Sequence, residues 1–151
     1  MNATSPTLQA DPGKVHEFLV GQLAERKKEL VEAGFKHGAV ICLVLGWIVS
    51  SQQAQRFFAT SWWVQFLATA GLVTYLVVYT CWVAAHYRHS RDIFKNLEAL
   101  DFMDSRLFAF LVIHRGFALL FILLHETVCL VMIAFIWMIP HFRDHLFLSM
   151  P

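Results

Sequence analysis

Charged side chains are scarce in this 151-residue sequence: Asp, Glu, Lys and Arg make up 15% of it, against about 25% in a typical soluble domain. Apolar residues make up 58%, and the mean hydropathy is +0.55. So few charges cannot cover a water-facing surface, which excludes a soluble globular protein. The net charge is only +1, so no basic field is present to hold nucleic acid. We therefore expect a lipid bilayer to surround the chain.

Cysteine is rare as well, and the common catalytic motifs are missing. Cys42, Cys81 and Cys129 lie apart, each within an apolar run, so neither a disulfide framework nor a paired metal motif is present. Phosphate-binding loops, GxGxxG and GxSxG motifs are absent. The run from His125 to Cys129 approaches the HExxH pattern of zinc proteases, but Cys129 stands where the second histidine belongs. We expect neither an enzyme nor a bound cofactor.

The N-terminal third predicts one long helix. Asp11 followed by Pro12 is typical of a helix start, because Asp caps the first turn and proline there gives up no hydrogen bond. Segment 12–35 has apolar and charged residues at helical spacing, which predicts an amphipathic helix after a flexible segment 1–11. An uncharged run of 19 residues follows between Lys36 and Arg56. At 1.5 Å per residue this run, taken as span 36–55, just crosses a hydrocarbon core of about 30 Å.

Two further apolar runs predict two further spans. Segment 62–85 carries no charge over 24 residues. Segment 107–139 has 33 residues and contains Arg115 and Glu126, so it is too long for one crossing and too short for two. We expect its start to lie in the headgroup region with Arg115 reaching outward, and the rest to cross the core and end at Pro140.

The distribution of basic residues predicts the orientation. Ten of the 12 Lys and Arg residues precede the first span or lie around the connection 87–105, and only Arg56 and Arg143 lie on the opposite side. Basic residues stay cytoplasmic, which places the N-terminus and 87–105 inside and the tail 140–151 outside. Apolar residues among the charges of 87–105 predict a short amphipathic helix beside the N-terminal one.

The predicted fold is therefore all-α: a polytopic membrane protein with three transmembrane helices, forming one membrane domain over residues 1–151. As a default we place it in the cell (inner, cytoplasmic) membrane.

Small residues recur every four positions along the first span. They are Gly34, Gly38, Cys42, Gly46 and Ser50. Such a ridge lets another helix backbone approach closely, and in lipid this packing replaces the missing hydrophobic drive for association. The ridge predicts a helix contact. The contacting helix is either a partner or second copy, or another span of the same chain.

Polar residues stand near the centre of the third span, at His125 and Glu126. A carboxylate at this depth costs about 2.5 to 3.5 kcal/mol on insertion scales, so Glu126 is protonated or partnered. Thr74, Tyr75 and Tyr79 of the second span lie at similar depth and are the expected hydrogen-bond partners. The interpretations are a proton or ion relay, a contact with a partner's buried cation, or a neutral clamp between helices.

The sequence contains eight histidines, which raises the question of a metal or haem. On the predicted topology His37, His86, His89 and His114 reach the same membrane boundary, where they could ligate a transition metal or the iron of a b-type haem. The plainer interpretation is that a boundary histidine only hydrates its polar tip.

A small chain with a packing ridge and little mass outside the bilayer favours a non-catalytic accessory or assembly subunit of a larger membrane complex. Its expected partners are the lipid bilayer and other membrane subunits or itself. Two alternatives stay open: a histidine-ligated metal or haem protein with a proton path, and a self-associating channel in which Glu126 lines the lumen.

Overall fold

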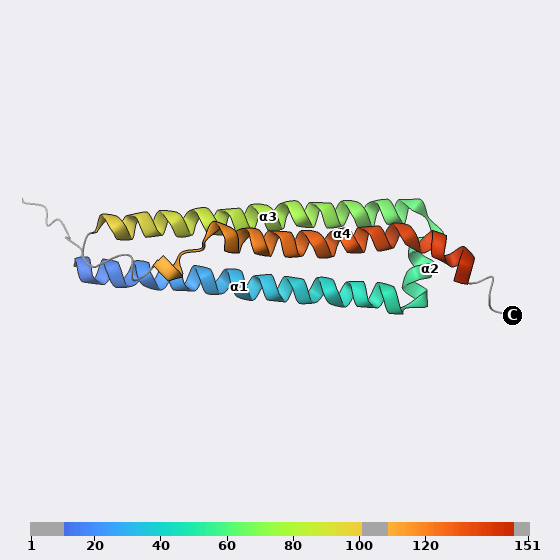
Figure 1. The fold of residues 1–151 in the computed structure, drawn as a ribbon, viewed down its shortest axis with the longest axis horizontal. Coiled ribbons are helices and arrows are strands. Elements are labelled where there is room, and N and C mark those ends of the chain that lie inside the picture. The colour runs from blue at the N-terminus through green and yellow to red at the C-terminus, as the bar shows by residue number, and fades with distance from the viewer. Residues whose placement is uncertain (1–10, 101–108, 147–151) are drawn as a thin grey trace, which may run out of the picture.

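The computed structural model describes residues 11–100 and 109–146, and the elements within these ranges are helices (Figure 1). Three long helices run side by side along the longest axis, and a short one lies across one end of the bundle (Figure 1). They are α1 (Pro12–Ser50), α2 (Gln52–Thr60), α3 (Trp62–Ala99) and α4 (Arg115–Leu146). Three helical segments are long and apolar enough to cross a membrane. The all-α class and the three apolar helices are thus confirmed.

Helix α1 begins where the Asp11–Pro12 pair predicts. The Asp11 carboxylate accepts a hydrogen bond of 3.0 Å from the Gly13 amide, and Pro12 occupies the first turn. The helix then continues to Ser50 without a break, so the amphipathic segment and the first apolar run form one rod about 58 Å long. Of the predicted flexible segment 1–11, all but Asp11 lies outside the described residues.

Helix α2 was not predicted from the sequence. Ser51 caps it, since its hydroxyl accepts from the Ala54 amide at 3.2 Å, and Ser61 caps α3 in the same way through the Trp63 amide. The corner between the two helices is closed by Gln65, which is buried and donates to the Phe58 carbonyl at 3.0 Å. These caps and this bond let the chain turn back within a few residues.

The separate short helix predicted within 87–105 is wrong over the part that the structure describes. Helix α3 runs unbroken to Ala99, because residues 86–99 contain neither glycine nor proline to end it. Residues 101–105 lie outside the described ranges. The predicted neighbour is present, however: Ile93 and Leu97 of α3 are buried in one cluster with Leu23 of α1.

Helix α4 starts at Arg115, after a 3₁₀ turn at 109–111 and a non-helical stretch. This break lies where the sequence predicts the change from headgroup region to core. The stretch is fixed to α3 by Ser90, whose buried hydroxyl accepts from the Ile113 amide at 3.1 Å. Residues 107–108 lie outside the described ranges.

Pro140 does not end the last helix, which corrects a prediction. Helix α4 continues to Leu146, so the predicted tail 140–151 begins as helix. A proline within a helix removes one backbone hydrogen bond and bends the helix without having to end it. Figure 1 shows α4 changing direction near its C-terminal end.

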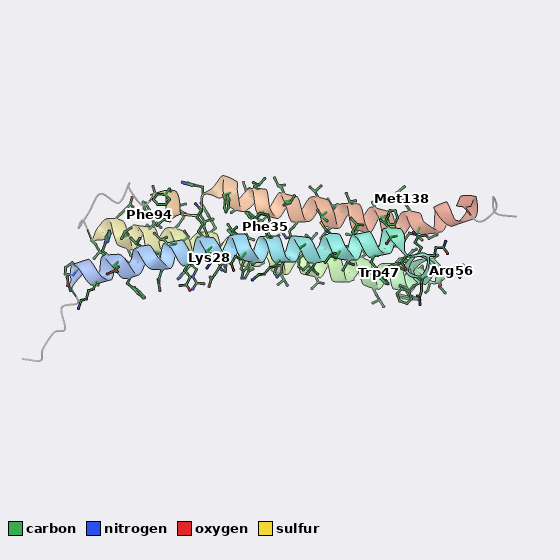
Figure 2. All side chains as sticks on the ribbon, turned by 90° about the horizontal axis from the view of Figure 1, so that it is seen from below. Lys28, Phe35, Trp47, Arg56, Phe94 and Met138 are labelled. Carbon is green, nitrogen blue, oxygen red and sulfur yellow. The ribbon has the colours of Figure 1, made fainter. Side chains whose placement is uncertain are left out.

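The buried core is thin and follows the line where the long helices meet. Its largest cluster joins all four helices near the α2 end; its buried members are Ile41, Ile48, Phe58, Cys129, Met132, Ile136 and Ile139. Large apolar side chains elsewhere are exposed, mainly within residues 35–49, 62–78 and 119–138, where sticks project from the outer faces of the long helices (Figure 2). An apolar exterior of this kind suits a hydrocarbon environment.

Candidate functional site

The first half of the small-residue ridge packs against α4 of the same chain. Gly34 is buried, and a Cβ atom built there would overlap the ring of Phe121. A Cβ atom at Gly38 would lie 3.9 Å from the Nε2 atom of His125, which is an ordinary contact. The approach of α1 to α4 therefore depends on the missing side chain at Gly34.

The second half of the ridge is open. Cys42, Gly46 and Ser50 are exposed, and a Cβ atom at Gly46 would meet nothing within 4 Å. The Ser50 hydroxyl donates to the Gly46 carbonyl at 2.7 Å, so it is satisfied within its own helix. The ridge thus divides into a first half that packs against α4 of the same chain and a second half that is exposed. We refer to the three residues of the second half, Cys42, Gly46 and Ser50, as the open stripe.

A groove of about 650 Å³ lies between α1 and α4. The α1 side is lined by Val31, Gly34, Phe35, Gly38, Ala39, Ile41 and Cys42, and the α4 side by Phe117, Leu120, Phe121, Leu124, His125 and Val128. Every lining side chain except that of His125 is apolar or a thiol. We refer to this space as the α1–α4 groove.

His125 is fixed in orientation, with one ring nitrogen left without a partner. Its side chain is 2% exposed, and its ring stacks on that of Tyr79 with centroids 4.0 Å apart. The Nδ1 atom lies 2.9 Å from the carbonyl oxygen of Phe121 one turn earlier. The Nε2 atom is buried and has no hydrogen-bond partner.

Two tyrosines and a histidine extend this polar group across the bundle. The hydroxyls of Tyr75 and Tyr79 are buried without hydrogen-bond partners, and their rings stack with centroids 5.9 Å apart. The ring of His37 reaches both from α1, at 6.2 and 5.9 Å. Thus the predicted metal candidate His37 instead joins Tyr75, Tyr79 and His125 in one cluster.

The predicted hydrogen bond of Glu126 to the second span is not formed in this structure. The Thr74 hydroxyl donates to the Ala70 carbonyl of its own helix at 2.8 Å, and the Tyr75 hydroxyl has no partner. Glu126 itself is partly buried. The residue that faces the other helices is its neighbour His125, because His125 shares a face with the buried Phe121 and Cys129.

The four boundary histidines are not all brought together. His37 and His86 line one cavity of about 490 Å³, His114 lines another of about 340 Å³, and His89 is exposed. The His86 Nε2 atom lies 3.6 Å from a carboxylate oxygen of Glu29. Within the described ranges, no group of three or more His, Cys, Asp or Glu residues is placed to hold a metal ion.

The cluster of histidines and tyrosines could be foreseen only in part. The spacing of Phe121, His125 and Cys129 along one helical face marks His125 as inward. The meeting of His37 with Tyr79 depends on the rotation of α1 about its axis, which the sequence does not encode locally. Comparisons with family models, with curated proteins and with solved structures give no match.

Proposed function

We propose that this chain is a small, non-catalytic membrane protein with three spans that serves as an accessory subunit of a larger membrane assembly. The basic residues support a cell-membrane protein with a cytoplasmic N-terminus and an external C-terminus. Within the apolar 18-residue windows of the three candidate spans, only 17%, 11% and 28% of residues are buried inside the chain. Most of the apolar surface is therefore available to lipid and to partner helices.

The main support for the proposal is that the ridge on α1 has one half packed within the chain and one half exposed. At Gly34 the ridge already accepts a neighbouring helix at close range, inside the chain. The open stripe continues the same line of small residues with nothing packed at Gly46. Close backbone approach is what drives helix association in lipid, so the stripe suits an apolar transmembrane helix of another membrane protein.

Large apolar side chains flank the open stripe. Leu43 and Trp47 are 74% and 54% exposed, and lie one residue from Cys42 and Gly46. A partner helix seated on the stripe would bury both, which adds contact area along one side of the stripe.

The experiment is native mass spectrometry of the chain extracted in mild detergent from its own host's membranes. The variant is Gly46→Leu, and the matched control is Gly71→Leu, because Gly71 is exposed on α3 and is also open at its Cβ position. We expect the wild-type chain and Gly71→Leu to carry the mass of another polypeptide, and Gly46→Leu to lose it.

Two results would contradict the proposal. A chain that carries no other polypeptide in any of the three forms has no subunit partner. A homo-oligomer that Gly46→Leu dissociates would mean that a second copy occupies the stripe, and the accessory role would fall.

A further inference from the structure

We propose that the α1–α4 groove holds one acyl chain of an anionic phospholipid, whose phosphate lies against the ammonium group of Lys27. The groove is a different surface from the open stripe, although Cys42 borders both. Lipid binding therefore does not depend on the accessory role.

The walls of the groove are suited to hydrocarbon. Phe35 on α1 and Leu120 and Leu124 on α4 line it and are 70%, 61% and 57% exposed. The Nε2 atom of His125, the one histidine in the lining, is buried, so an occupant meets apolar contacts only. An acyl chain makes such contacts and brings no polar group that needs a partner.

The length of the groove matches one leaflet of a bilayer. Its lining runs from Val31 to Cys42 on α1 and from Phe117 to Val128 on α4, an interval of eleven residues on each helix, or about 16 Å. Half of a hydrocarbon core is about 15 Å thick. Phe117 lies two residues after the start of α4, so the groove extends from the edge of the core to about its middle. A spanning helix needs about twice this length, whereas an acyl chain of one leaflet does not.

A cation lies at the Val31 end of the groove. Lys27 precedes Val31 by one turn, and its Nζ atom lies 5.9 Å from the ring centroid of Phe117, which is part of the wall. The ammonium group donates to the Phe110 carbonyl at 2.7 Å. This bond uses one of its three protons, so two remain for a phosphate oxygen.

Lys27 differs from the basic residues beside it, because the ion pairs found among the described residues do not include it. Arg26 pairs with Glu29 at 3.0 Å, and Lys28 with Glu32 at 3.6 Å. The uncompensated charge of Lys27 complements a headgroup with a net negative charge. Phosphatidylcholine offsets its phosphate with its own ammonium group, so an anionic lipid should bind more tightly.

The test uses the full chain in mild detergent, with lipid binding measured by native mass spectrometry. The probes are phosphatidylglycerol and phosphatidylcholine with identical acyl chains. We expect phosphatidylglycerol to bind about five-fold more tightly, as one lysine near a membrane surface provides. In Lys27→Gln, whose amide can still donate to the Phe110 carbonyl, this preference should disappear.

Two matched controls locate the site. Lys95→Gln removes an exposed lysine that lines a separate cavity of about 340 Å³, so the preference should remain. Ala39→Trp fills the groove from an exposed position in its lining and should abolish the tight binding of phosphatidylglycerol. Ala70→Trp, at an exposed position of α3 outside the groove, should not. Circular dichroism checks that each variant keeps its helices.

The proposal is overturned if the wild-type chain does not distinguish the two lipids, or if the preference survives Lys27→Gln or Ala39→Trp. It is also overturned if Lys95→Gln removes the preference, because the anionic lipid would then lie in the other cavity. A dimer that Ala39→Trp dissociates would overturn it as well, since a second copy would then fill the groove.

Discussion

Phe121 packs its ring against Gly34 so closely that no Cβ atom fits between them. This contact joins α1 to α4 near the Val31 end of the groove and distinguishes the two halves of the ridge. Gly46, three turns further along the same helix, has open space at its Cβ position. The two glycines therefore form a matched pair for measuring how much close helix approach contributes to the free energy of unfolding.

Gly34→Ala should destabilise the fold by about 1–3 kcal/mol, because the ring of Phe121 must move out of a packed position. Gly46→Ala should be neutral or should stabilise by up to about 1 kcal/mol through helix propensity. Both values can be measured as changes in the free energy of unfolding in mixed micelles. Equal effects at the two positions would contradict the packing described.

The hydrogen bond that Ser90 accepts from Ile113 should be the main polar contact between α3 and the stretch before α4. Ser90→Ala leaves the buried Ile113 amide without its acceptor, at a cost of about 1–3 kcal/mol. Hydrogen exchange at the Ile113 amide should accelerate at the same time. Ser50→Ala is the control, since that exposed hydroxyl forms a hydrogen bond only within its own helix. Similar losses of stability in both variants would contradict a special role for the Ser90 hydrogen bond.

Tyr75→Phe should leave stability unchanged or raise it by about 1 kcal/mol. The Tyr75 hydroxyl is buried without a partner, so the ring can keep its stacking on Tyr79 while an unsatisfied group is removed. A loss of more than about 1 kcal/mol would show that the hydroxyl has a partner, such as water. The free energy of unfolding is again the measured quantity.

The orientation is tested by labelling single cysteines, in a background without the native ones, with a membrane-impermeant maleimide. Gln53→Cys lies on α2 and Asn96→Cys near the end of α3, and both positions are exposed. In intact cells position 53 should react and position 96 should react only after permeabilisation. The reverse pattern would mean that the topology is inverted. Labelling of both positions in intact cells would mean that α3 does not cross the membrane between them.

Much of the fold could be predicted from the sequence, because apolar run length and the Asp11–Pro12 start are local signals. Helix α2 could not be predicted, since nine residues are too few to show a helical period of apolar residues. The only local signals are Ser51 and Ser61, which are typical cap residues. The site was predicted least well. In the sequence Glu126 stands out by its charge, whereas in the structure His125 lies on the packed face of α4.

Site-specific photo-crosslinking tests whether the open stripe on α1 receives a partner helix. Benzoylphenylalanine at Leu43 flanks the stripe, and the control is Leu67 on α3, with similar exposure (74% and 67%). After irradiation in native membranes, position 43 should give a discrete adduct with another polypeptide and position 67 should not. Adducts of equal yield at both positions, or at neither, would contradict the account.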